Sequence, residues 1–188
     1  MKNKLKSSNL FFRGLIKQLS SSYIIALVVL FLYVYLMQFA DHTPIWTSYL
    51  VVVIALFKTI YFTFFTFKQV NKSIERCHSF TQLLWIFGLL MFLIIFSYAA
   101  DYTCLYAANS NSFQGVLTFK ANIYLNQLFE FFYLSVVTFA SIGYGDIVPV
   151  SIPAKLLIML EIGQSFVLIV FGLSNINNIH MLKNHKKS

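Results

Sequence analysis

The chain has 188 residues, of which 59% are hydrophobic and only 11% are charged. This composition lies well outside that of soluble globular proteins and predicts a protein that crosses a membrane several times. A net charge of +8 would indicate nucleic acid as a partner in a soluble protein. Basic residues also flank membrane spans on the cytoplasmic side, so no nucleic-acid partner is expected here.

The first 21 residues, 1–21, form a basic segment whose apolar and basic side chains have helical spacing. Two interpretations are open for it: an amphipathic helix on the inner leaflet that binds anionic lipids, or a disordered basic tail. A cleaved signal peptide is not expected, because the apolar stretch that follows is too long and "MQFA" is a poor cleavage site.

Four apolar segments are long enough to cross a membrane, since about 20 helical residues at a 1.5 Å rise span a hydrocarbon core of roughly 30 Å. The first two form a peripheral transmembrane hairpin, residues 22–67, because only "DHTP" separates them. The four segments are residues 22–40, 45–67, 80–100 and 153–176.

The basic residues predict how these segments are oriented. Five precede the first segment, three lie in the loop 68–79 and three lie in the tail 177–188, so eleven of the 14 share one side. By the positive-inside rule that side is the cytoplasm, and both termini lie in it. Cys77 and Cys104 then fall on opposite sides of the membrane, so no disulfide is expected between them.

A further apolar stretch, residues 123–140, fits a short helix but is followed by "SIGYGDIVP" and not by another span. A full crossing there would also place the basic C-terminal tail on the side of the membrane opposite to the other basic segments. We therefore expect a re-entrant helix that follows an extracellular loop, residues 101–122. Irregular backbone at membrane depth is allowed only where it is buried in protein or lines a water-filled path.

The segment "SIGYG", residues 141–145, places glycines at alternate positions. Glycine adopts left-handed dihedral angles without a clash at the β-carbon. Alternation of right- and left-handed residues turns successive carbonyl groups toward the same side. Several chains about one axis would then present rings of carbonyl oxygens, which replace the water around a cation that is costly to dehydrate in a low dielectric.

The stretch "TFASIGYGDIVP" resembles the selectivity filter of potassium channels, whose signature is Thr-Val-Gly-Tyr-Gly-Asp. The resemblance covers roughly residues 80–176 and implies an outer helix, a pore helix, a filter and an inner helix. It implies an all-α membrane protein with four transmembrane helices, a re-entrant pore helix and a filter loop. Four chains would assemble as a homotetramer in the lipid bilayer.

The resemblance also implies roles for individual residues. Backbone carbonyls would coordinate K⁺, the Ser141 hydroxyl would add to the innermost site, and Gly145 would open the outer mouth. The K⁺ ligands would be Ser141, Ile142, Gly143 and Tyr144. Residues that would support the filter are Asp146, Tyr133 and Thr138.

Two departures from the family pattern predict a filter that is held less firmly. Ser141 replaces the usual threonine and lacks its γ-methyl group, so its rotamer is less constrained. Families often place tryptophan at the positions of Tyr133 and Leu134. The Tyr133 hydroxyl can still donate to Asp146, whereas Leu134 has no hydrogen-bonding group. We expect this filter to collapse more readily at low potassium.

Alignment to the inner helix of the family implies the lining of the pore below the filter. Ser165 takes the place of the usual hinge glycine, and Gly163 and Gly172 are the candidate hinges. The residues expected at the pore wall and gate are Ser165, Phe166, Ile169 and Leu173. Ordinary helix packing is the alternative for such an apolar stripe. The gate itself is expected near residues 173–177.

Two ionisable residues, Lys58 and Glu161, fall inside predicted spans. Charges at this depth cost at least ~2.5 kcal/mol and usually have a partner. One arrangement is a Lys58–Glu161 ion pair that joins the hairpin to the pore. In the other, Lys58 reaches toward the inner interface and Glu161 bonds to pore-helix hydroxyls such as Ser135 or Thr138.

The sequence predicts a potassium-selective channel with passive conduction, K⁺ as the permeant ion and no cofactor. No catalytic residues and no enzyme activity are expected, since no His, Cys or paired-carboxylate constellation falls at membrane depth. The alternatives are a weakly selective cation channel and a non-conducting membrane scaffold. The small chain suggests a prokaryotic plasma membrane.

Overall fold

The computed structural model describes residues 46–74, 80–117 and 123–185, which lie in one compact unit of the chain, residues 42–188. Three long helices and one short helix, α4, form most of this part. The elements are α2 (Trp46–Ile74), α3 (Phe80–Ala108), η1 (Ser110–Ser112), β1 (Phe113–Gln114), α4 (Ile123–Phe139), β2 (Val148–Pro149) and α5 (Ile152–His185).

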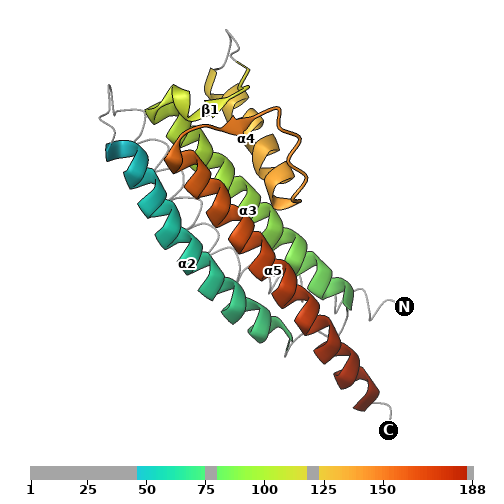
Figure 1. Cartoon of the computed structure of the whole chain (residues 1–188). Helices are drawn as coiled ribbons and strands as arrows, with labels where there is room; N and C mark the ends of the chain where they lie inside the picture. Colours follow the sequence, from blue (N-terminus) through green and yellow to red (C-terminus); the bar gives the residue numbers. More distant parts are fainter. Residues whose placement is uncertain (1–45, 75–79, 118–122, 186–188) are drawn as a thin grey trace. The chain divides into compact units, whose positions relative to one another are not determined.

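The long helices α2, α3 and α5 run side by side in alternating directions (Figure 1). Helix α3 packs against α2, α4 and α5, and α2 also packs against α5. The chain beyond α4 returns to the end of α3, where β1 and β2 pair antiparallel with Phe113 opposite Pro149. Helix α4 and the segment after it therefore enter and leave at one end of the bundle.

Each long helix contains a stretch that is long and apolar enough to cross a membrane. These stretches are Trp46–Phe64, Leu84–Ala108 and Ile152–Ser174. They overlap the predicted spans at 45–67, 80–100 and 153–176. The predicted span 22–40 and the basic segment 1–21 lie outside the described residues.

Three predicted boundaries are wrong, in each case because a helix continues into a polar stretch. Helix α3 runs to Ala108, so residues 101–108 are helical and not part of an extracellular loop. Helix α2 runs to Ile74, into the predicted loop 68–79. Helix α5 runs to His185, into the predicted tail 177–188. A helix can continue through polar residues, so a polar stretch does not show where its backbone hydrogen bonds end.

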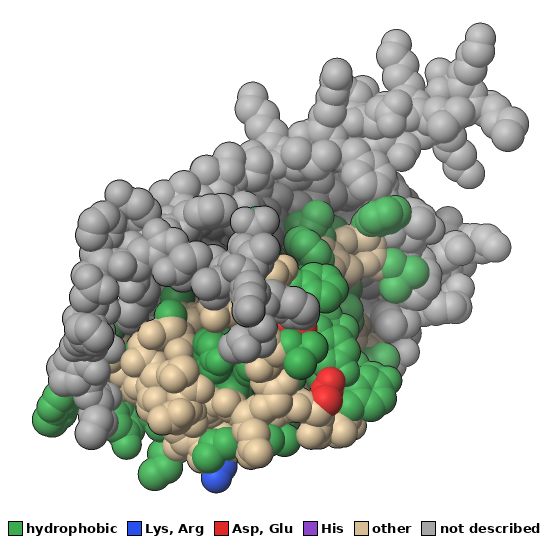
Figure 2. All heavy atoms as spheres, turned by 90° about the horizontal axis from the view of Figure 1, so that it is seen from above, with side chains coloured by type: hydrophobic (Ala, Val, Ile, Leu, Met, Phe, Trp, Pro, Cys, Tyr) green, Lys and Arg blue, Asp and Glu red, His purple; other side chains and the backbone are tan. Residues whose placement is uncertain are grey.

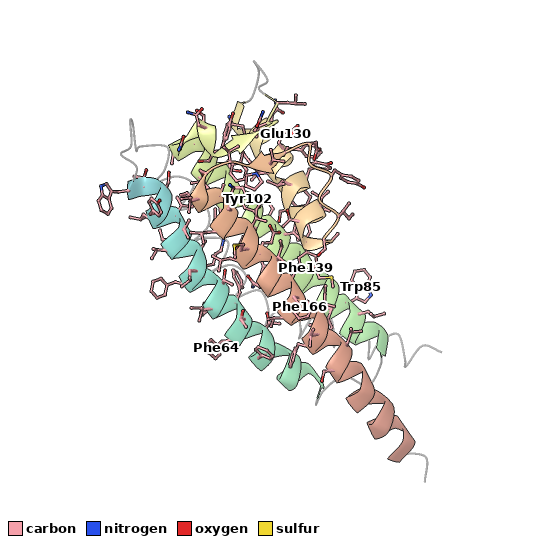
Figure 3. All side chains as sticks on the ribbon, viewed as in Figure 1. Phe64, Trp85, Tyr102, Glu130, Phe139 and Phe166 are labelled. Carbon is pink, nitrogen blue, oxygen red and sulfur yellow. The ribbon has the colours of Figure 1, made fainter. Side chains whose placement is uncertain are left out.

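Aromatic side chains fill the interior beside α4. Tyr102 and Phe131 are fully buried, and the ring centroids of Phe113 and Phe131 lie 5.0 Å apart in an edge-on arrangement. Large apolar side chains also cover the outside: Phe64 and Trp85 are exposed and point away from the bundle (Figure 3). In lipid, no hydrophobic effect drives such side chains inward, so outward-facing aromatics suit a membrane helix.

The end of the bundle that carries η1 and the β1–β2 pair shows apolar side chains and only a few charged ones among the described residues (Figure 2). The segment that follows α4 lies at this end.

Candidate functional site

The end of α4 leads directly into the Gly-Tyr-Gly segment. Backbone N–H groups beyond the helix still bond to carbonyls of its last turn: Ser141 N to Thr138 O at 2.9 Å, and Ile142 N to Val137 O at 2.9 Å. Helix α4 ends at Phe139, and residues 140 and 141 form a turn. Thr138, predicted to support the filter, is buried, and its carbonyl accepts the bond that ends the helix.

The backbone from 141 to 145 alternates in hand. The φ angle is positive at Ser141 (56°), Gly143 (58°) and Gly145 (79°), and the residues between them are not left-handed. Glycine adopts this region freely, whereas Ser141 does so at a cost of about 1–2 kcal/mol. The alternation predicted from the two glycines is present. It begins two residues before the first of these glycines, at Ser141.

The segment faces out of the single chain. Residues 141–146 are all exposed, and the Tyr144 side chain has 67% of its surface accessible. Backbone polar groups in this state need a partner from another molecule, from water or from an ion. The K⁺-binding roles of Ser141, Ile142, Gly143 and Tyr144 stay predictions.

A side-chain hydrogen bond joins α4 to the residue after the segment. The Tyr133 hydroxyl donates to the Asp146 carboxylate, which lowers the pKa of Asp146 and raises the pKa of Tyr133. This is the contact that the sequence suggested. The neighbouring Leu134 is buried, and its apolar side chain brings no donor to this region.

The outer end of the segment is held by a part of the chain that sequence reasoning missed. The Ser112 carbonyl accepts hydrogen bonds from Val150 N at 2.9 Å and Ser151 N at 3.3 Å. Gly115 has φ of +90°, and a β-carbon there would lie 1.8 Å from the Asp146 carbonyl oxygen. Only glycine fits so close to the residue after the filter, and the motif "FQG" gave a weak signal of such a turn.

Glu161 of α5 is fully buried and connects three helices. Its two carboxyl oxygens are hydrogen-bonded to the Ser135 hydroxyl of α4 and the Tyr102 hydroxyl of α3. The prediction that Glu161 bonds to pore-helix hydroxyls is confirmed for Ser135. The alternative Lys58–Glu161 pair is wrong.

Lys58 pairs with Asp101 of α3 instead. Its ammonium group also donates to the Ser97 carbonyl at 3.1 Å and lies 5.1 Å from the centre of the Tyr98 ring. The sequence placed Asp101 in a loop because "DYTC" begins a polar stretch. The longer α3 turns this residue inward, where its side chain is nearly inaccessible.

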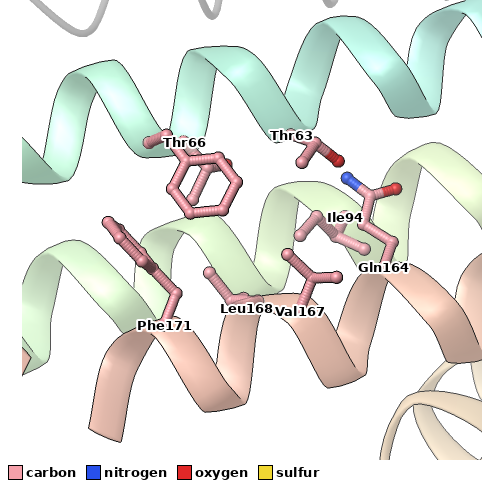
Figure 4. A pocket seen from close by; sticks show the side chains of 8 residues that line it. Thr63, Thr66, Ile94, Gln164, Val167, Leu168 and Phe171 are labelled. Atoms are coloured by element: carbon pink, nitrogen blue, oxygen red, sulfur yellow. The ribbon is translucent and has the colours of Figure 1, made fainter. Parts of the chain in front are cut away.

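A second polar contact joins α2, α3 and α5. The Tyr98 hydroxyl lies 2.6 Å from the Thr59 hydroxyl and donates to Gln164 Oε1 at 3.1 Å. Gln164 Nε2 is buried, and no residue of the described part of the chain accepts a bond from it. A cavity of about 10 Å³ adjoins this amide, with Thr63 across from it (Figure 4). That volume is close to the minimum for one water molecule.

The inner-helix predictions have mixed outcomes. Ser165 does not face outward: its side chain is 2% exposed and donates to the Ile162 carbonyl of its own helix at 2.8 Å, so the predicted pore-lining role is wrong. Three side chains face outward and stay candidates for the pore wall: Phe166, Ile169 and Leu173. The side chains of residues 175–177, in the expected gate, lie outside those described.

The two candidate hinge glycines differ in their surroundings. Helix α5 is continuous through both. A β-carbon at Gly163 would meet nothing within 4 Å, whereas one at Gly172 would lie 3.0 Å from the Phe87 ring of α3. Gly172 thus permits close packing of α5 on α3, and its role as a hinge stays a prediction.

Comparison with known proteins agrees with this geometry. Residues 111–181 match a family model described as "Ion channel". They include β1, α4, the Gly-Tyr-Gly segment and most of α5. This part of the chain is therefore similar to that family. The ion channel family is not a family of enzymes.

A curated relative of the chain is the Arabidopsis thaliana protein named "Two-pore potassium channel 4", with 28% identity over 92 residues. The aligned part is 49% of this chain and 30% of the relative, so the chain spans less than a third of that protein's length. No solved structure matches the chain significantly.

We predict that Lys58 and Asp101 contribute to stability as a pair. Lys58→Met leaves a buried carboxylate without its partner and should cost about 3–5 kcal/mol. Asp101→Asn should cost less, because the long Lys58 side chain can reach toward water. The double variant should be more stable than Lys58→Met alone. Thermal unfolding in detergent, followed by tryptophan fluorescence, measures all three; additive effects would contradict the pairing.

Gly115→Ala should disturb the outer end of the Gly-Tyr-Gly segment. The added β-carbon overlaps the Asp146 carbonyl, and its φ disfavours alanine, so the backbone there must shift. We expect ion flux through vesicles that contain the protein to fall steeply. Gly88→Ala is the matched control, because its β-carbon meets nothing within 4 Å and alanine favours a helix. Equal flux in both variants would refute the assignment.

Tyr133→Phe should return the pKa of Asp146 toward its usual value near 3.8. Because the folded-state pKa is lowered, the bond stabilises the loop at pH above the ordinary aspartate range and is lost as the pH falls below it. The variant should lose ion flux sooner after transfer to low potassium at neutral pH, and at a higher pH on acidification. Identical time courses and pH profiles for variant and wild type would show that the bond does not support the filter.

Proposed function

We propose that the chain is one subunit of a potassium-selective channel that conducts K⁺ passively across a membrane. The observation that carries this proposal is the alternation of positive φ at residues 141, 143 and 145 within Ser-Ile-Gly-Tyr-Gly-Asp. Such a backbone can turn a row of carbonyl oxygens to one side, and oxygens of this kind replace the hydration shell of K⁺ in channel filters. The name of the Arabidopsis relative supports the choice of ion.

A single chain supplies only one wall of such a filter. The ion needs oxygens around its whole circumference, and residues 141–146 are open to the outside of the chain. We therefore propose a homotetramer with the four segments about a common axis. The α5 stripe of Met159, Ile162, Phe166, Ile169 and Leu173 is exposed in one chain and supports this arrangement, because part of it would face the axis below the filter.

The proposed setting is a plasma membrane, with both termini on the cytoplasmic side and a prokaryotic source. The distribution of basic residues supports this orientation. The three described spans alternate in direction, which places the end with β1 and β2 opposite to the C-terminal end of α5 (Figure 1). The Gly-Tyr-Gly segment then opens toward the outer solution through Asp146. Anionic lipids are the proposed partners of the N-terminal basic segment.

A weakly selective cation channel is the second candidate. Two observations favour it: the left-handed Ser141, whose small side chain constrains the innermost site weakly, and the buried Leu134, which provides no hydrogen bond behind the filter. Both functions require conduction, so the ratio of K⁺ to Na⁺ permeability separates them.

The test is ion flux through purified full-length protein in liposomes. We expect K⁺ and Rb⁺ uptake that Ba²⁺ blocks and that greatly exceeds Na⁺ uptake. Gly143→Ala should abolish it, because its left-handed backbone is unfavourable for alanine by about 1–2 kcal/mol in each subunit.

Gly88→Ala is again the control, since it changes a glycine of the same chain in a regular helix. Equal K⁺ and Na⁺ flux would favour the weakly selective channel. Liposomes with no flux above that of protein-free vesicles, or a protein that is monomeric in mild detergent, would overturn the proposal.

A further inference from the structure

Glu161 is a carboxylic acid with no accessible surface in the middle of a membrane-spanning stretch. An ionisable group at this depth is expensive and marks either a functional site or a specific partner. Among the described residues, the salt bridge of the unit is Lys58–Asp101, and no basic side chain pairs with Glu161. The groups that face it are hydroxyls: Ser135 from α4 and Tyr102 from α3.

Glu161 and its two partners lie on α5, α4 and α3, and α4 leads directly into the Gly-Tyr-Gly segment. Ser135 is in the second half of α4, six residues before Ser141. Its hydroxyl is fully buried and also lies 2.9 Å from the Ile95 carbonyl of α3. One side chain of α5 therefore holds the C-terminal half of α4 against α3.

We propose that Glu161 is the positioning residue of the pore helix: its carboxyl group fixes α4 relative to α3 and α5, and so sets where the filter carbonyls lie. The inference rests on the proposed channel function. Glu161 touches no ion in this arrangement and acts through α4. Because a filter discriminates ions by the placement of its oxygens, a change at Glu161 should alter selectivity and not only stability.

Hydrogen-bond counting predicts which substitution preserves the arrangement. Ser135 has one hydroxyl hydrogen but lies within reach of two acceptors, the Ile95 carbonyl and Glu161 Oε1. A glutamine at 161 donates its amide hydrogen to Ser135, which leaves the Ser135 hydrogen for Ile95. The glutamine carbonyl still accepts from Tyr102. Glu161→Gln should therefore retain all the contacts, whereas Glu161→Leu removes both side-chain bonds.

The experiment compares the K⁺/Na⁺ permeability ratio of full-length variants in liposomes. Glu161→Leu is expected to lower the ratio roughly tenfold, equivalent to about 1.4 kcal/mol of lost discrimination. Glu161→Gln should keep the wild-type ratio. Ser135→Ala and Tyr102→Phe each remove one of the two hydroxyl partners of Glu161 and should give intermediate ratios. These two single variants keep the test decisive if Glu161→Leu does not assemble.

Leu168→Ala is the control for a merely structural role, since Leu168 is buried in α5 on the side of the cavity shared with α2. It should lower thermal stability but leave the permeability ratio unchanged. A wild-type ratio in Glu161→Leu, Ser135→Ala and Tyr102→Phe would overturn the positioning role while the channel function stands. Wild-type liposomes without K⁺ flux would instead refute the proposed function itself.

Discussion

Backbone that leaves helical geometry inside a membrane must find partners for its polar groups, because lipid offers none. The segment after α4 is the described part of this chain where that constraint is most severe. Its backbone is irregular, its residues are exposed, and it lies beside helices whose own hydrogen bonds are internal. The chain holds it at both ends: Val137 and Thr138 carbonyls accept its first N–H groups, and Gly115 lies against the Asp146 carbonyl at the other end. The residues between these two ends, 142–145, are exposed.

The lack of polar partners in lipid also explains why the charges inside the helix bundle are paired. Lys58 and Asp101 lie on different helices, and each would be costly alone in an apolar surrounding. Replacement of a buried ion pair by apolar residues often leaves stability unchanged or raises it, so the pair is weak evidence for stability. The ion pair instead fixes the register of α2 against α3. An ion pair, unlike an apolar contact, is lost if α2 slides along α3, and the Ser97 carbonyl adds a second fixed point one turn away.

The features that could be predicted from sequence are those with a local cause. The alternating glycines and the Tyr133–Asp146 bond depend on residues close together in the chain, and apolar length alone located three spans. Features that depend on distant packing could not be predicted. The polar neighbours of Asp101 predict a loop, although the half-buried Lys58 of α2 gives it a partner. The residues around Gly115 in the sequence do not indicate that the Asp146 carbonyl lies beside it. Ser165 was placed on the pore wall by analogy, but α5 is rotated so that its side chain points inward.

Helix α2, which is predicted to lie at the periphery, is joined to α3 by polar contacts. Tyr98 and Tyr102 lie one helical turn apart on α3, with ring centroids separated by 6.3 Å. Tyr98 contacts Thr59 of α2 and Gln164 of α5, whereas Tyr102 contacts Glu161, which in turn holds α4. Glu161 and Gln164 are also about one turn apart on α5, so successive turns of α3 and α5 are joined by the Tyr102–Glu161 and Tyr98–Gln164 bonds. A shift of α2 along α3 cannot keep the Thr59 contact unless Tyr98 moves, and Tyr98 packs against the tyrosine that holds Glu161. The positions of α4 and α2 are therefore linked by one continuous set of side chains.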